Sequence, residues 1–488
     1  MAAPDVVSLL PDLLALAAPG FLSPNPLQAD FALGGYFFAG LTSGQAAGPS
    51  AAAGPTDDHA DQAVYGDVAR AAYGVTGAGI RVGILSDSFN LLGGAAAEEA
   101  SGDLPPNVTV LEEGPAGSHD EGRAMAELIH RIAPGAQILF HTATAGQADF
   151  AAGIKALVAA GCNVIVDDVA YLNEPFFQDS GTVQQAVAQA VAAGVSYFTA
   201  AGNQGGNFVQ QTMALLRLVL PGLPPGAAVQ DFGPAAAPQP WLDVTIPSGG
   251  EGIFDLQWNE PFGASADSLG MALYGADGTL LASATGDQTG SHPDQILRYV
   301  NSGSATGFRL VVYANGGAAP PGLFKIIAYG NAGIADALAG IGSGSVIGHA
   351  LVPGANTVGA MAWSAAPRFG GTNTPESFSS VGQGTLLLAP NGTPLTEPQS
   401  ASKVDFLAPD GSLTGVLAPF FGTSAAAANA AGVAALVLQA DPSLTPAQMT
   451  QVLEQTATPA LGAAAAVGAG LLDASAAVAQ ALALHAAA

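Results

Sequence analysis

The sequence has little charge and very few basic residues. Charged residues make up 10% of the 488 residues, and Asp and Glu outnumber Lys and Arg by 38 to 11, which gives a formal charge of -27. Nucleic acids and anionic membranes repel such a protein, so we expect neither as a partner. Protonation of the carboxylates would leave few positive charges to repel one another, so the composition is compatible with a protein that stays folded at low pH.

Cysteine and long apolar runs are also scarce. The single cysteine, Cys162, excludes internal disulfides, and its apolar neighbours predict a buried thiol. No stretch has the roughly 18 consecutive strongly apolar residues of a membrane span. The N-terminus lacks the positive start of a signal peptide. We expect a soluble and secreted protein, although no signal peptide is recognisable.

The pattern of expected elements divides the chain into four segments. Residues 1–56, rich in Ala, Gly, Pro and Leu, are predicted to be an extension and linker. Strands alternate with helices over 57–208, which is typical of a doubly wound parallel sheet. Short strands between Gly, Pro, Asp and Asn predict a β-sandwich over 209–345. Residues 346–480 return to the α/β pattern, so the sandwich is an insertion in an α/β fold.

The expected elements follow from hydrophobic periodicity. In the first α/β segment we expect helices over 121–133, 148–161 and 182–194, and strands over 80–87, 136–143, 163–169 and 195–203. The inserted strands are expected over 241–247, 252–258, 271–276, 308–314 and 323–330, followed by a buried strand over 355–363. The insert should have its own core and closely spaced ends, so its deletion should leave a foldable protein.

The most specific motif is Gly-Thr-Ser-Ala, which opens a long helix of small residues at Gly422. A serine in the first turn of a helix lies near backbone N–H groups and the positive end of the dipole, which favour a developing oxyanion. This motif resembles that of the subtilase superfamily of serine endopeptidases, whose nucleophile lies in a Gly-Thr-Ser-x-Ala pattern. The resemblance implies a subtilisin-like fold, polypeptide substrates and Ser424 as the nucleophile.

Further segments extend the resemblance. "GVTGAGIRVGILSDSFN" is similar to the family's first core strand, whose final Asp orients the catalytic base, and this implies that role for Asp87. "AAGVSYFTAAGNQG" is similar to the oxyanion-hole segment and implies that Asn203 binds the oxyanion. "ESFSSVG" and "ANTVGAMA" match lesser landmarks of the family.

One departure concerns the base, because the family's helix begins His-Gly-Thr-His and this chain has "EGRAMA" from Glu121. Glu121 therefore occupies the place of the histidine. The related sedolisins use a Ser-Glu-Asp triad, but their second acid corresponds to Met125 here, so Asp87 is expected to be the orienting acid. A second candidate for the base is His119, which precedes the helix by two residues; otherwise it is a solvated or structural loop histidine.

A glutamate can serve as a general base if it lies within reach of the serine. Two neighbouring acids cannot both ionise easily, so Asp87 and Glu121 should share a proton, with one pKa raised by about 1 to 3 units. The sequence therefore predicts a pH optimum of about 4 to 6, below the range of His-dependent subtilases.

Asp168 follows a predicted strand and by register faces the substrate cleft. It could bind a basic substrate residue, join the acidic cluster, or simply accept hydrogen bonds from loop N–H groups. No cofactor is expected, and no loop has a ligand pattern to which a structural Ca²⁺ could be assigned. The insert is either a structural shield of the cleft or a binding surface.

The loss of the family's histidine leaves a second function open. The protein could be an inactive pseudoprotease that binds peptides or acts as a scaffold. The retention of Ser424, Asn203 and an Asp-Glu pair favours an active peptidase.

Overall fold

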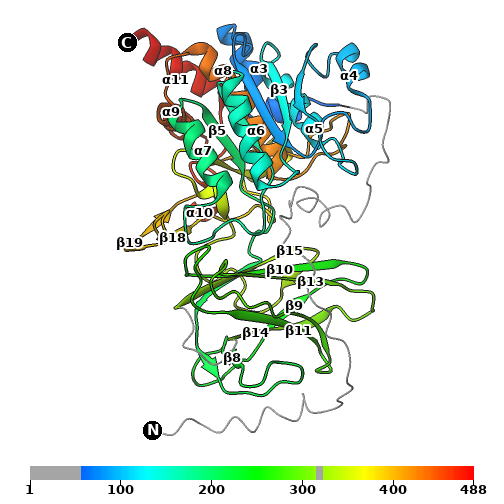
Figure 1. The fold of residues 1–488 in the computed structure, drawn as a ribbon. Coiled ribbons are helices and arrows are strands. Elements are labelled where there is room, and N and C mark those ends of the chain that lie inside the picture. The colour runs from blue at the N-terminus through cyan, green and yellow to red at the C-terminus, as the bar shows by residue number, and fades with distance from the viewer. Residues whose placement is uncertain (1–55, 315–321, 488) are drawn as a thin grey trace.

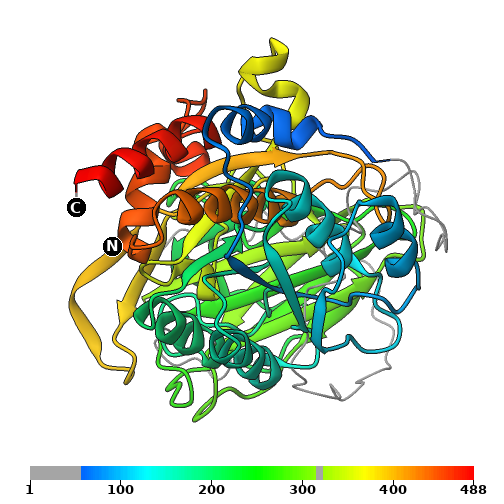
Figure 2. The same ribbon diagram turned by 90° about the horizontal axis from the view of Figure 1, so that it is seen from above.

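The computed structural model describes residues 56–314 and 322–487, arranged as two lobes (Figure 1). The predicted extension lies outside the described residues, apart from Thr56. We call the part built on the parallel sheet the α/β lobe, and the part from β6 (Phe208–Thr212) to β16 (Gly333–Ile334) the insert. Seen from above, the strands of the insert lie beneath the α/β lobe (Figure 2). The segment boundaries given above stay predictions.

The α/β lobe is built on a seven-stranded parallel sheet in the order β2-β3-β1-β4-β5-β17-β20. Its strands are β1 (Arg81–Ser86), β2 (Thr109–Glu112), β3 (Gln137–Thr142), β4 (Val164–Asp167), β5 (Ser196–Ala200), β17 (Asn356–Ala362) and β20 (Phe406–Asp410). From β1 the sheet continues through β4, β5, β17 and β20 on one side and through β3 and β2 on the other, which is a doubly wound arrangement and confirms the predicted fold class. Strand β2 was not expected, because all four of its residues are exposed and show no apolar alternation.

Helices cover both faces of this sheet. Helices α5 (Glu121–Ile132) and α8 (Thr423–Ala440) pack on one face, and α6 (Gln147–Ala159) and α7 (Thr182–Ala192) on the other. The other α-helices among the described residues are α2 (His59–Ala63), α3 (Gly66–Tyr73), α4 (Ala95–Ser101), α9 (Pro446–Thr456), α10 (Ala464–Val467) and α11 (Ala474–Ala487). Cys162 is buried, as predicted, and burial raises the pKa of its thiol to about 12.

Helix α8 is the central helix of the lobe. Its small side chains allow close packing against α5: a Cβ added at Gly432 would lie 3.0 Å from the Cβ of Ile132. By length and composition α8 could cross a membrane, but 94% of it is buried inside the protein, as expected of a core helix. The small residues therefore bring the N-termini of α5 and α8 to fixed positions relative to each other.

The insert is a β-sandwich, as predicted. One sheet has the order β13-β10-β15-β6, the other contains β12-β11-β14-β8-β7 with β9 and β16 attached, and their apolar faces form a common core. The strands within the insert are β7 (Leu215–Leu216), β8 (Ala228–Gln230), β9 (Leu242–Thr245), β10 (Glu251–Trp258), β11 (Leu269–Gly275), β12 (Leu280–Ala284), β13 (Asp294–Val300), β14 (Gly307–Ala314) and β15 (Leu323–Gly330). A separate hairpin, β18 (Gly384–Leu388) and β19 (Pro394–Ala401), projects from near the junction of the lobes (Figure 1).

The insert and the α/β lobe also share a core, which the sequence did not predict. Phe176 and Phe177, from the segment after β4, form one apolar cluster with Ile253 and Ile327 of the insert. The buried Gln257 accepts a hydrogen bond from the Phe176 N–H (2.9 Å) and donates to the carbonyls of Leu172 (3.1 Å) and Glu174 (2.9 Å). Deletion of the insert would expose this cluster, so the expectation of a freely removable domain does not fit the packing.

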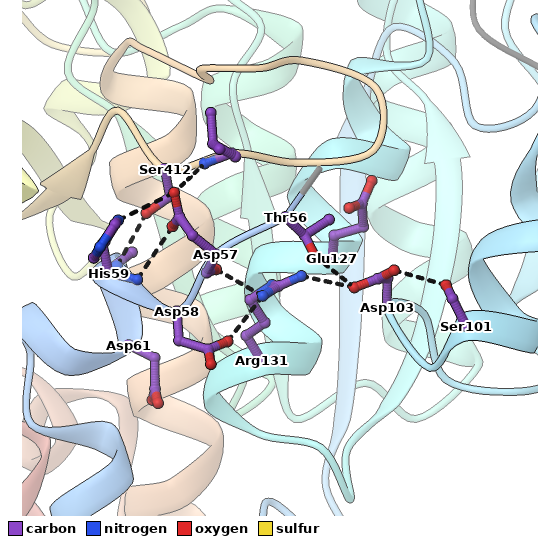
Figure 3. Close-up of polar contacts among 12 residues, drawn as sticks. Thr56, Asp57, Asp58, His59, Asp61, Ser101, Asp103, Glu127, Arg131 and Ser412 are labelled. Carbon is purple, nitrogen blue, oxygen red and sulfur yellow. Dashed lines mark hydrogen bonds and ion pairs between the residues drawn. The ribbon is translucent and has the colours of Figure 1, made fainter. Parts of the chain in front are cut away.

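The start of the described chain is held by the C-terminal end of α5 (Figure 3). Arg131 donates to the carbonyl of Asp57 (2.6 Å) and forms ion pairs with Asp58 and Asp103, both at 2.8 Å. On the same helix, Glu127 accepts a hydrogen bond from the N–H of Gly415 (2.7 Å), in the loop that leads towards α8. Helix α5 is thus tied to three separate segments, which fixes its position on the sheet.

The shared core leads to a stability prediction. We expect Gln257→Leu to lower the free energy of unfolding by about 2 to 4 kcal/mol, because it leaves three buried backbone groups without partners. Hydrogen exchange should also become faster at Leu172, Glu174 and Phe176. The matched control is Gln295→Leu, because Gln295 is equally buried but bonds to Gly286 within the insert. Equal exchange changes in both variants would contradict the role given to Gln257.

Candidate active site

The predicted site residues gather where strands end and helices begin. Asp87 follows β1, Asp168 follows β4 and Asn203 lies three residues after β5, at the carboxyl edge of the sheet. Glu121 is the first residue of α5, and Ser424 is the second residue of α8. This edge is the usual location of sites in open α/β sheets, because loops of different strands meet there.

The position of Glu121 is fixed by the residues on either side of it. Asp120 has a left-handed backbone (φ 59°), and its buried carboxylate accepts hydrogen bonds from the N–H groups of Leu91 (2.8 Å) and Leu92 (2.9 Å). Gly122 lies against the sheet, since an added Cβ would overlap the ring of Phe140 in β3 and lie 2.8 Å from the carbonyl oxygen of Ser88 in the loop after β1. The start of α5 therefore cannot move away from or towards the sheet without breaking these contacts.

The carboxyl of Glu121 is buried beside two other acids and a serine. Burial raises its pKa well above the ordinary value, and the carboxyls of Asp168 and then Asp87 raise it further, whereas the Ser424 hydroxyl lowers it. One oxygen of Glu121, Oε1, is buried with no hydrogen-bond donor among the described residues. A buried carboxyl oxygen that lacks a donor favours the protonated form, since the charged form would be unsolvated.

Asp168 is the nearest acidic partner of Glu121. It is 4% exposed, and its Oδ2 accepts a hydrogen bond from Ser86 Oγ (3.2 Å). Burial raises its pKa to about 7, although its contacts with Glu121 and Ser86 act in the opposite direction. The two carboxyls therefore hold at least one proton at neutral pH and titrate as a pair.

Ser424 and Asn203 both lie at the first turn of α8. Ser424 is 1% exposed, and its Oγ makes no hydrogen bond of good geometry to a described residue. The side-chain oxygen of Asn203 accepts from both the N–H and the hydroxyl of Thr423, each at 3.0 Å. These bonds fix the orientation of the Asn203 amide next to the first turn of α8.

Asp87 contacts the backbone of the α5 start rather than the side chain of Glu121. Its carboxylate accepts hydrogen bonds from the N–H groups of His119 (2.6 Å) and Glu121 (2.8 Å). Burial raises its pKa, and these backbone N–H groups act in the opposite direction. The ring of His119 is 74% exposed, with Nδ1 4.0 Å from Asp87, so this side chain lies at the surface of the site.

A second buried polar cluster, which the sequence did not reveal, lies directly beside the first. Nε2 of His349 is 3.0 Å from Asp167, and its Nδ1 is 2.9 Å from Glu174. Burial acts to lower the pKa of His349, but the carboxylates of Glu174 and Asp167 outweigh it and raise the pKa well above its ordinary value. The cluster anchors the end of β4, one residue before Asp168. Only the two adjacent acids at 167 and 168 hinted at it in the sequence.

One group of side chains could hold a metal ion in the described part of the chain. The ligand atoms of Glu112, His141 and Asp149 lie within 4.8 Å of one another. Nδ1 of His141 bonds to the carbonyl of Thr142 (2.7 Å), and Nε2 lies 3.5 Å from Glu112, so both ring nitrogens already have neighbours within the chain. The group includes none of the residues assigned to the site.

Several buried carboxyls of raised pKa lead to a prediction about stability. Burial raises the pKa of Asp168 to about 7, and those of Glu127 and Asp410 to about 8. The folded protein therefore binds more protons than the unfolded chain above about pH 4, and its stability falls as the pH rises. We expect the free energy of unfolding, measured with urea, to be at least about 2 kcal/mol greater at about pH 5 than at about pH 7.

A suitable control for this effect is Glu127→Gln, which removes one of these carboxyls. In this variant the free energy of unfolding should fall less steeply as the pH rises. A stability that rises between about pH 5 and 7 would show that these groups are ionised in the folded protein.

Comparison with known proteins gives matches for both the sequence and the fold. The model of the Subtilase family matches residues 265–470, and no curated protein matches the chain. The CspB protease of Clostridium perfringens is 15% identical, with a TM-score of 0.54 over 86% of this chain and 97% of that one. MycP1 from Mycobacterium smegmatis is 16% identical, with a TM-score of 0.41 over 88% and 87%. The chain therefore has a subtilisin-like fold, and the segment that contains Ser424 matches the Subtilase family.

Proposed function

We propose that the protein is a serine endopeptidase that hydrolyses polypeptides through an acyl-enzyme, with Ser424 as nucleophile and Glu121 as general base. The observation that carries this proposal is the buried Ser424 hydroxyl, placed in the first turn of α8 beside the Glu121 carboxyl. The family match includes Ser424 but not Glu121. The assignment of Glu121 therefore rests on its contacts in this chain.

The reaction begins from the singly protonated pair of Glu121 and Asp168. As Ser424 attacks the peptide carbonyl, Glu121 takes the serine proton and the shared proton moves to Asp168, so the negative charge passes to the tetrahedral oxyanion. The Ser424 N–H at the helix terminus and the amide of Asn203 stabilise this charge. Glu121 then gives its proton to the leaving amine, and water hydrolyses the acyl-enzyme by the same steps. No cofactor takes part.

The two aspartates support the base in different ways in this proposal. Asp87 supports the start of α5 by accepting the backbone N–H of Glu121, and thereby positions the base. Asp168, for which the sequence left open substrate binding, membership of the acidic cluster and bonds to loop N–H groups, is proposed as the proton-sharing partner of Glu121. An inactive pseudoprotease would have no reason to keep two buried carboxyls beside a buried serine, because such carboxyls cost stability. Secretion of the enzyme stays a proposal.

The first prediction for this proposal concerns activity. Ser424→Ala should abolish hydrolysis of peptides, and Glu121→Gln should lower kcat/KM by about 10²- to 10⁴-fold, because the amide cannot accept the serine proton. His119→Ala should retain most of the activity, since its ring is largely exposed. The measurements are kcat/KM on a peptide library and labelling of Ser424 with a fluorophosphonate.

These variants also separate the possible functions. Full activity of Glu121→Gln with loss of activity in His119→Ala would assign the base to His119. A wild-type protein that neither cleaves any peptide nor reacts with the fluorophosphonate would be a pseudoprotease.

The second prediction is the pH profile. Below its first ionisation the acid pair holds two protons and offers no base, so kcat/KM should rise with pH around the pKa of about 7 of Asp168. This is higher than the optimum of about pH 4 to 6 expected from the sequence, which assumed a less buried pair of Asp87 and Glu121. The profile is measured from about pH 4 to 9.

The profile of Asp168→Asn provides the control, because histidine would titrate in the same range. In Asp168→Asn the only carboxyl left to ionise is that of Glu121, whose pKa burial raises well above the ordinary value, so the rise in kcat/KM should move to higher pH. His119→Ala should leave the rise unchanged. A rise that moves in His119→Ala but not in Asp168→Asn would contradict the glutamate mechanism.

A further inference from the structure

A small cavity lies beside the proposed reactive groups. It is lined by Asp168 and the two residues that follow it, and by the end of β5 with the residues on either side of Asn203, namely Gly202 and Gln204. Its volume is about 10 Å³, which is room for about one water molecule. The cavity therefore adjoins both the acid pair and the amide that would bind the oxyanion.

Further lining residues of the cavity come from outside the α/β sheet. Tyr329 of β15 lines it, together with Ile347 and His349. Tyr329 is 3% exposed and packs in the apolar cluster that the insert shares with the α/β lobe. Its hydroxyl is buried and bonds to no described residue. Strand β15 lies between β10 and β6, so its backbone is held on both sides and the ring cannot easily be displaced.

The position of the cavity decides which part of a substrate enters it. The carbonyl carbon must lie at Ser424 and its oxygen must point to Asn203. The substrate residue that supplies this carbonyl must then direct its side chain between the residues next to Asn203 and Asp168. These residues line the cavity. Space for one water molecule admits hydrogen, methyl or hydroxymethyl, whereas a larger side chain would overlap the Tyr329 ring.

We propose that Tyr329 of the insert closes this cavity and restricts cleavage to bonds whose carbonyl belongs to Gly, Ala or Ser. This inference rests on the proposed peptidase function and names its substrate class. It also gives the insert a role at the site: one of its strands supplies the wall that sets specificity.

The test compares peptides that differ only in the residue that supplies the cleaved carbonyl, with Ala in one and Phe in the other. Wild type should cleave the Ala peptide at least about tenfold faster in kcat/KM, the scale on which a pocket distinguishes small apolar groups. Tyr329→Ala should open the cavity and raise kcat/KM for the Phe peptide at least about tenfold, so that the preference for Ala shrinks or reverses.

The matched control is Tyr313→Ala. Tyr313 of β14 is also buried in the insert with an unpartnered hydroxyl, but it packs in the other sheet and does not line the cavity. This variant should keep the wild-type preference. If Tyr329→Ala does not fold, the pair Tyr329→Leu and Tyr313→Leu replaces the alanine variants, and the increase for the Phe peptide should be smaller but in the same direction.

The outcomes separate this proposal from the peptidase function. A wild type that prefers Phe, or a preference that stays the same in the folded Tyr329 variants, would overturn the role of Tyr329 while the enzyme remains a peptidase. A wild type whose Ser424 does not react with a fluorophosphonate and that cleaves neither peptide would overturn the peptidase function, and the inference would fall with it.

Discussion

The close packing of α5 on the sheet and against α8 is the constraint on which the rest of the site depends. Gly122 and Gly432 lie at two close contacts, where an added Cβ would meet the ring of Phe140 in β3 and the side chain of Ile132 in α5. Because Glu121 precedes Gly122 and Ser424 lies in the first turn of α8, these contacts bring a carboxyl and a hydroxyl together without a bond between them. Preorganisation of this kind comes from the scaffold rather than from the reacting groups.

A carboxyl in this position behaves differently from an imidazole. A neutral imidazole can be buried at little cost, whereas a buried carboxylate without donors is strongly disfavoured and retains its proton. Asp168 reduces the cost of a negative charge at this buried site, because two carboxyls can share one proton and one negative charge between them. Burial therefore determines the pKa values of Glu121 and Asp168 more than the ordinary pKa of a carboxylic acid does. For the same reason the overall acidic composition says little about the pH at which the site works.

The sequence predicted those features that depend on local patterns. Alternating strands and helices gave the doubly wound sheet, and the Gly-Thr-Ser turn located Ser424 at the start of α8, because periodicity and turn chemistry are local properties. The strand β2 was missed because its exposed residues have no apolar pattern. The contact between Glu121 and Asp168, and the ion pairs of His349, join residues that are distant in sequence. Spacing along the chain contains no signal for such contacts.

The insert and the site are linked through the segment that follows β4. Asp167 bonds to His349 and Asp168 faces Glu121, and a few residues later the same segment is held by Gln257 and by the shared apolar cluster. In an α/β lobe without the insert, Phe176 and Phe177 would be exposed to water, and the segment would lose the contacts that hold it. The segment that this exposure would destabilise is the same short stretch of backbone that contains Asp168. The inserted sandwich is therefore part of the support of the acid pair, and not only a cover placed over it.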